Sequence, residues 1–153
     1  MEKIEEPTLL FGKSKWIWSA DAAKKNSNII LRRTLSFGQE RPPARAFCRA
    51  ACETHYCLFV NGNAVVWNGG LNRSAENAYY DEFDIAKYLI KGDNVIVVHC
   101  VYYGNEGRDT VCAERAGFIF ECNDLEIYSD KTFTVYENAA FKAPRTTNCC
   151  YAG

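Results

Sequence analysis

The sequence has no long hydrophobic run, no excess of one charge and no leader-like start, and each absence removes a class of protein. Its longest apolar stretches are far shorter than the roughly 20 residues that span a bilayer. The net charge is -1, from 18 basic and 19 acidic residues spread along the chain, which argues against nucleic acid or a membrane surface as the main partner. The start, MEKIEEPTLLFGK, is acidic and polar around one short apolar patch, so it does not have the pattern of a signal peptide.

The eight cysteines show none of the spacings that typically bind a metal. No C-x-x-C pair occurs, and the two histidines do not flank cysteines, so a structural zinc site is not indicated. Without an export signal, a disulfide framework is also disfavoured. Because several cysteines lie inside strand-like runs, we expect a cytoplasmic protein with buried, reduced thiols at Cys48, Cys52, Cys57, Cys100 and Cys122.

Motifs of small enzymes are missing as well. No serine lies in a nucleophile-elbow pattern. Gly69-Gly70 lacks the strand-to-helix context of a phosphate-binding loop. His55 and His99 lie within strand runs, where a packed or hydrogen-bonded histidine is the expected role. We therefore expect no cofactor and no metal site, although the loop carboxylates permit a calcium ion without requiring one.

The strongest positive signal is a hairpin in Thr54–Trp67, THYCLFVNGNAVVW. Its first half alternates two sets of side chains with the period of a half-buried strand. Asn61-Gly62 supplies the positive φ angles of a tight turn, and Ala64–Trp67 runs back in the opposite direction. This hairpin predicts an antiparallel β protein.

Other short runs of β-branched and aromatic residues predict strands over residues 28–36, 44–53, 78–83, 94–103 and 117–123. The run over 94–103 is the most apolar, so we expect it at the centre of a sheet. Residues 125–129 and 132–137 are expected to pair as a hairpin around Asp130-Lys131. One short helical turn is expected over 84–90, capped by Asp84 and ended by Gly92.

Together these elements predict an all-β fold, an antiparallel β-sandwich of jelly-roll type. In such a fold a glycosidase would need two carboxylates placed across a sugar. Two groups of acidic residues are available, but their spacing singles out no catalytic pair, so solvated loop carboxylates are the plainer interpretation: Asp81, Glu82 and Asp84, and Glu106, Asp109 and Glu114.

Two long polar loops are the better functional candidates. Aromatic rings stack on the C–H face of a sugar, while carboxylates, amides and guanidinium groups take its hydroxyls. The same residue types are enriched where protein domains meet. The loops therefore predict either a carbohydrate site or a domain interface, formed by Trp67, Arg73, Tyr79 and Tyr80 in the first loop and by Tyr103, Glu106, Arg108 and Asp109 in the second.

Four segments, taken in order, resemble the N-terminal β-sandwich, a galactose-binding-like domain, of bacterial α-L-rhamnosidases of glycoside hydrolase family seventy-eight. Related modules occur in β-galactosidases and β-glucuronidases. The chain departs from the family where Gly-Pro often follows the hairpin, since it has Asn68-Gly69-Gly70 there. The resemblance covers residues 15–145 and is carried by WIWS with NIILRRTLS; ARAFCRAACETHYCLFVNGNAVVWNGG; YYDEFDIAKYLIKGDNVIVVHCVYYG; and RAGFIFE with TFTVYENAAFKAP.

The resemblance implies a non-catalytic accessory domain that packs on downstream domains of the same polypeptide and can help to hold rhamnose- or galactose-type sugars. In that family the catalytic carboxylates lie in a separate helical barrel, to which nothing here corresponds, so no catalytic residue is assigned. The implied organisation is a flexible segment over 1–15, a sandwich over 16–143 and a tail over 144–153 leading to a further domain. An autonomous carbohydrate-binding module and a small stand-alone enzyme are the alternatives.

Overall fold

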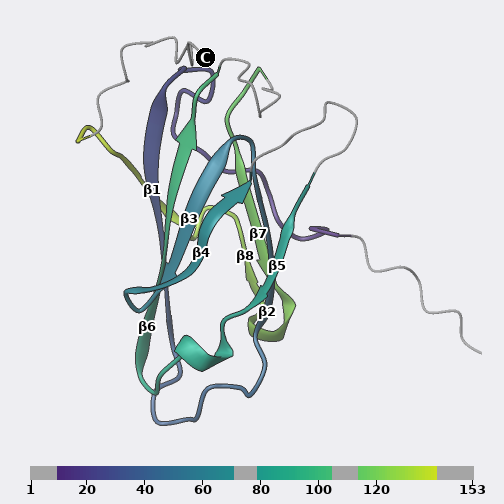
Figure 1. Cartoon of the computed structure of the whole chain (residues 1–153). Helices are drawn as coiled ribbons and strands as arrows, with labels where there is room; N and C mark the ends of the chain where they lie inside the picture. Colours follow the sequence, from purple (N-terminus) through teal and green to yellow (C-terminus); the bar gives the residue numbers. More distant parts are fainter. Residues whose placement is uncertain (1–9, 71–78, 105–113, 141–153) are drawn as a thin grey trace, which may run out of the picture.

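The computed structural model describes residues 10–70, 79–104 and 114–140. Two antiparallel sheets pack face to face, which confirms the predicted all-β sandwich (Figure 1). The large sheet has the order β4-β3-β6-β1-β9, with β1 at Ser27–Ser36, β3 at His55–Val60, β4 at Asn63–Gly70, β6 at Asp93–Tyr102 and β9 at Thr134–Glu137. The small sheet has the order β5-β2-β7-β8, with β2 at Phe47–Cys52, β5 at Asp81–Asp84, β7 at Phe118–Cys122 and β8 at Ile127–Tyr128.

The predicted hairpin is formed by β3 and β4, and its turn is Asn61-Gly62, with φ angles of 50° and 80°. β4 continues beyond Trp67 to Gly70, so part of the predicted first loop is strand. Gly69 allows this extension, because a Cβ at that position would lie 2.3 Å from ring carbons of the buried Tyr56. The glycines that follow the hairpin are thus required by packing.

β6 lies in the middle of the large sheet, between β3 and β1, as its apolar sequence predicts. Ile96, Val98 and Cys100 alternate along it and are fully buried. They meet inward side chains of the small sheet, and this apolar burial is the main source of stability. The facing residues include Cys48, Ala50, Phe118 and Phe120.

The five cysteines expected to be buried thiols are all buried and form no disulfide. Cys48 of β2 lies directly opposite Cys122 of β7. The hydrogen bond between these thiols, together with burial, raises the pKa of Cys48. The Cys48 thiol therefore stays protonated and behaves as a small apolar core group.

The predicted helical turn is present but shorter than expected. η1 is a single 3-10 turn at Ala86–Tyr88, and its N-cap position is Ile85 rather than the predicted Asp84. Asp84 lies one residue earlier, where its Oδ1 accepts the backbone N–H of Ala86 over 2.8 Å. The turn ends well before Gly92, whose φ of 80° instead bends the chain into β6. A second 3-10 turn, η2 at Asn123–Leu125, follows β7 and was not predicted.

Asn94, at the start of β6, is only 2% exposed and all of its amide atoms are bonded. Its Nδ2 donates to the carbonyls of Ile90 and Gly92, at 2.8 and 3.0 Å. Its Oδ1 accepts from the N–H of Ile90 and from Nδ2 of Asn61, both at 2.8 Å. Oδ1 of Asn61 in turn accepts the N–H of Val95 over 2.9 Å. This network joins the β3–β4 turn to the turn before β6.

The predicted hairpin around Asp130-Lys131 is wrong. β8 pairs with β7 in the small sheet, whereas β9 pairs with β1 in the large sheet, so the segment between them crosses the sandwich. Phe133 is the physical reason: it is 4% exposed and packs against Phe120 in the core. Burying that ring draws the chain from one sheet to the other.

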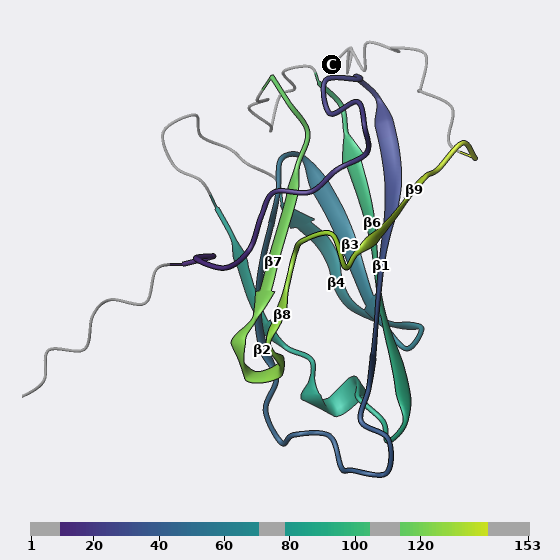
Figure 2. The same ribbon diagram turned by 180° about the vertical axis from the view of Figure 1, so that it is seen from behind.

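The segment before β1 completes the edge of the small sheet. Ile17 exchanges backbone hydrogen bonds with Phe118 of β7, at 2.9 and 3.0 Å, and the N–H of Lys15 donates to the carbonyl of Ser129 over 2.7 Å. Figure 2 shows this segment crossing over β7. Ile17 and Trp18 also pack on the core, so this segment is docked on the sandwich.

In the described part of the chain, no helix is long and apolar enough to cross a membrane.

Candidate functional site

The outer face of the small sheet is closed by the chain's own charged pairs. Arg49 of β2 lies between Glu82 of β5 and Glu121 of β7, at N–O distances of 2.8 and 3.1 Å. Glu82 and then Glu121 raise the pKa of the Arg49 guanidinium by hydrogen bonding to it. Phe47 lies beneath that guanidinium, 5.6 Å from ring centroid to Cζ. Polar groups on this face therefore already have partners.

The outer face of the large sheet has a different composition. Because side chains alternate along a strand, the β6 residues between the buried ones point outward, and these are Val95, Val97, His99 and Val101. All of them keep part of their surface in water, and the valines are not among the described residues that pack against the core. A strand that is apolar on both faces is typical of a sheet covered on both sides.

Neighbouring strands extend this surface sideways. In the register of the large sheet, Cys57 and Ile30 flank His99, and Phe59 flanks Val97. The Trp67 side chain on β4 is 69% exposed and meets the Phe59 ring edge-on, with centroids 6.2 Å apart. We call this surface the apolar face; its exposed or half-buried apolar residues are Ile30, Phe59, Trp67, Val95, Val97, Val101 and Tyr136. Cys57 is buried among them, and the exposed Arg32 lies opposite Val97.

His99 lies at the centre of the apolar face. Its Nε2 and Oδ1 of Asn28 are 3.1 Å apart, in hydrogen-bonding contact. Burial, and then the nearby His55, lower the pKa of His99 below its ordinary value. The imidazole is therefore neutral at neutral pH, so His99 itself adds no charge to the face.

The structure separates the aromatic residues predicted for the site. Trp67 belongs to the apolar face, whereas Tyr80 precedes β5 and contacts Phe11, with ring centroids 6.0 Å apart. Tyr79 and Tyr103 are also largely exposed, and the Tyr103 carbonyl accepts the N–H of Asn26. Whether these side chains bind a ligand stays a prediction. The other predicted site residues lie outside the described residues: Arg73, Glu106, Arg108 and Asp109.

The first group of acidic residues is engaged in holding the fold. Each carboxylate has a partner within hydrogen-bonding distance, on another strand or at the start of η1. In the described part of the chain, no cluster of three His, Cys, Asp or Glu side chains could share a metal ion. The partners are the Tyr56 hydroxyl for Asp81, Arg49 for Glu82, and the backbone N–H groups of Ala46 and Ala86 for Asp84.

A pocket of about 620 Å³ lies where the segment before β1 meets the start of β7. We call it the tryptophan pocket; Trp16, Trp18, Glu53, Arg115 and Gly117 contribute to its walls. The Trp16 side chain is 59% exposed, while Glu53 is 7% exposed. The sequence did not predict this site, because its residues come from three distant segments. Backbone hydrogen bonds between those segments bring them together, including those of Ile17 with Phe118 and of Glu53 with Gly117.

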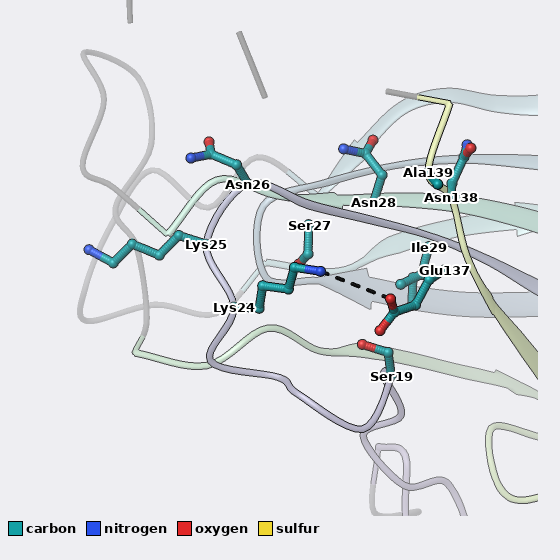
Figure 3. A pocket seen from close by; sticks show the side chains of 10 residues that line it. All are labelled: Ser19, Lys24, Lys25, Asn26, Ser27, Asn28, Ile29, Glu137, Asn138 and Ala139. Atoms are coloured by element: carbon teal, nitrogen blue, oxygen red, sulfur yellow. Dashed lines mark ion pairs between the residues drawn. The ribbon is translucent and has the colours of Figure 1, made fainter. Parts of the chain in front are cut away.

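A second pocket, of about 360 Å³, lies beside the start of β1 and the end of β9. Figure 3 shows Lys24 and Glu137 facing each other across it, with Lys25 extending away. The Lys24 and Glu137 charges are 3.9 Å apart and both side chains are largely exposed, so their pairing is weak. Most residues that line this pocket are polar, and none of them is aromatic.

Comparison with known proteins places the fold. No protein-family model matches the chain, and no curated protein matches its sequence. Among solved structures, the GH78 rhamnosidase of Bacillus sp. GL1 matches with a TM-score of 0.70 and 24% identity, over 82% of this chain and 13% of that one. The α-L-rhamnosidase of Aspergillus terreus matches with a TM-score of 0.62 and 17% identity, over 83% of this chain and 17% of that one.

The α-L-rhamnosidase of Streptomyces avermitilis, solved with L-rhamnose, matches with a TM-score of 0.56 and 18% identity, over 90% of this chain and 14% of that one. The chain therefore spans only a small part of each of these proteins. At such identities the likeness concerns the fold. The chain is a β-sandwich similar in fold to one small part of α-L-rhamnosidases.

Proposed function

We propose that the chain is a non-catalytic accessory domain of a larger, α-L-rhamnosidase-like glycoside hydrolase, and that its apolar face packs against another domain of the same polypeptide. The contrast between the two outer faces carries this proposal. The small sheet covers its outer face with the Glu82–Arg49–Glu121 pairs, whereas the large sheet presents outward valines and aromatic rings. Contiguous exposed apolar surface of this kind marks an interaction site.

Another domain of the same polypeptide is the occupant that the similar solved structures favour. In each of them the matched region is a small share of a much longer chain, between 13% and 17%. The face is also suited to a protein surface, because Trp67 and Tyr136 stand at its edges. The exposed Arg32, which lies opposite Val97, adds a charged group for a partner surface to pair with. Aromatic residues are enriched where proteins meet.

A non-catalytic role is supported by the acidic residues of the first group. Asp81, Glu82 and Asp84 hold strands and turns together, so a reaction would have to use groups already engaged in the fold. A cytoplasmic location is part of the proposal, and the five buried cysteines, which form no disulfide, support a reducing compartment. The sandwich over 16–143, with a tail leading to a further domain, completes the proposed organisation.

Sedimentation velocity at high micromolar concentration tests the exposed face. The wild-type chain is expected to associate reversibly, because the apolar face has no covering domain. Val97→Lys places a positive charge on the face beside Arg32 and is expected to give a monomer with an unchanged unfolding midpoint. Ile90→Lys makes the same chemical change at an exposed position outside the face and is expected to sediment like the wild type. A monomeric wild type would contradict the proposal.

An autonomous carbohydrate-binding module is the second candidate function. Trp67, with 69% of its side chain exposed, is the observation in its favour. This function requires saturable binding of a rhamnose- or galactose-type sugar that is lost in Trp67→Ala. If the wild type shows no saturable change with either sugar, this candidate is excluded.

A further inference from the structure

We propose that the tryptophan pocket binds a neutral pyranose sugar, with the ring stacked on Trp16 and its hydroxyls bonded to Glu53 and Arg115. This inference goes beyond the docking role and does not depend on the apolar face. It names a carbohydrate site away from the two loops that the sequence singles out.

The Trp16 ring is exposed but fixed in place. A Cβ added at Gly117 would lie 2.8 Å from Cε3 of Trp16, so the indole rests directly on the glycine backbone. The next residue, Ile17, is anchored by its two backbone hydrogen bonds to Phe118. Even so, 59% of the Trp16 side chain faces water, although tryptophan is on average highly buried. A ring already held in position loses little conformational freedom when a ligand stacks on it.

Glu53 supplies a positioned hydrogen-bond acceptor beside that ring. Its Oε2 accepts the hydroxyl of Thr54 over 2.7 Å, and its backbone N–H donates to the carbonyl of Gly117 over 3.0 Å. The glycine that supports Trp16 therefore also fixes the backbone of Glu53. Arg115, two residues before Gly117, lines the same pocket and brings guanidinium donors.

These walls combine a large apolar surface with a few polar groups, which is the usual composition of a small-molecule site. The volume of about 620 Å³ lies within the range typical of such pockets. A pyranose matches the walls because its axial C–H groups form an apolar face, which the electron-rich face of an indole attracts. Its hydroxyls both donate and accept, so one ring can bond to Glu53 and Arg115 together.

The pocket favours a neutral sugar. Its lining contains one acidic residue, Glu53, and one basic residue, Arg115, so it offers no net charge to a charged ligand. A neutral ring can use both groups through its hydroxyls.

The test is to titrate the full chain with the methyl glycosides of L-rhamnose, D-galactose and D-glucose. Binding is measured by calorimetry and by intrinsic tryptophan fluorescence. At least one is expected to bind saturably. Trp16→Ala is expected to raise the Kd at least tenfold, and Arg115→Gln to raise it severalfold, both with an unchanged unfolding midpoint. Gly117→Ala, which displaces the ring without removing it, is expected to weaken binding as well.

Trp67→Ala and Val97→Lys serve as controls, and both are expected to bind like the wild type. Absence of saturable binding by all three glycosides would overturn the inference. So would a loss of binding in Trp67→Ala that Trp16→Ala does not share, since the sugar would then lie on the apolar face. Tighter binding of D-galacturonate than of D-galactose would contradict the selection of a neutral ring. None of these outcomes bears on docking, because docking is read from association of the Val97→Lys variant.

Discussion

The hydroxyl of Tyr56 donates a hydrogen bond to Oδ2 of Asp81 over 2.7 Å, and this bond ties the large sheet to the small one. The same oxygen accepts the N–H of Gly70 over 3.2 Å. Burial of Tyr56, and then its bond to Asp81, raise the pKa of the phenol, so the hydroxyl remains a donor throughout the accessible pH range. An acidic residue that the sequence offered as a possible catalytic group is thus a link between the sheets.

Asp81→Ala is expected to lower the free energy of unfolding by about 1.5–3 kcal/mol, because it leaves the buried Tyr56 hydroxyl without its charged partner. Urea denaturation followed by circular dichroism measures this loss. Glu82→Ala is the matched control, since it removes a neighbouring carboxylate from a partly exposed ion pair, and its cost should stay below about 1 kcal/mol. Equal losses for the two variants would show that Asp81 is not a special link.

Gly69→Ala is expected to destabilise the sandwich by about 1–3 kcal/mol through overpacking. The added methyl group would meet the Tyr56 ring at 2.3 Å, and that ring cannot withdraw while Asp81 holds its hydroxyl. The same substitution in a Tyr56→Leu background should cost less, so the two changes should be non-additive. Additive losses in urea denaturation would show that Gly69→Ala does not destabilise the fold through the Tyr56 ring.

Asn94→Ala is expected to cost about 3 kcal/mol or more, since it removes an amide whose bonds satisfy buried backbone groups of Ile90 and Gly92. Asn94→Asp keeps the acceptor but loses the donor, and should recover part of the loss. Thermal unfolding midpoints are expected to be highest for the wild type, intermediate for Asn94→Asp and lowest for Asn94→Ala. If the alanine variant were as stable as the wild type, the network would not contribute to stability.

His99 is expected to make the stability of the folded chain sensitive to acid. The folded state lowers its pKa below the ordinary value of 6.5, so the unfolded chain binds the proton more readily. The neutral imidazole therefore makes its full contribution to the free energy of unfolding above about pH 6.5. This contribution is lost as the pH falls below that value toward the lowered pKa. His99→Gln should lose less stability than the wild type between about pH 7 and pH 5. Identical losses in urea denaturation at the two pH values would exclude His99 as a source.

Local signals in the sequence predicted much of the fold. Asn61-Gly62 predicts the hairpin because its positive φ angles are a property of the turn itself. The apolar run over 94–103 predicts the central position of β6, since only a strand buried among others tolerates so few polar groups. The five buried cysteines follow from the same reasoning.

Contacts between distant segments could not be predicted. Phe133 carries no local signal that it enters the core and separates β8 from β9, so a hairpin was the natural interpretation. The tryptophan pocket depends on Gly117 lying under Trp16, which no local pattern indicates. The apolar face was present in the sequence as Val95, Val97 and Val101, but outward valines are distinguished from core valines only once the register is known.

The most direct test of the docking role uses the polypeptide encoded after the codon for Gly153 in the source gene. The account predicts that the reading frame continues, and that this downstream polypeptide, produced separately, binds the chain in isothermal titration calorimetry. Val97→Lys should weaken that binding at least tenfold, while Ile90→Lys and Trp16→Ala should bind like the wild type. A reading frame that stops at once, or binding that Val97→Lys leaves unchanged, would contradict the account.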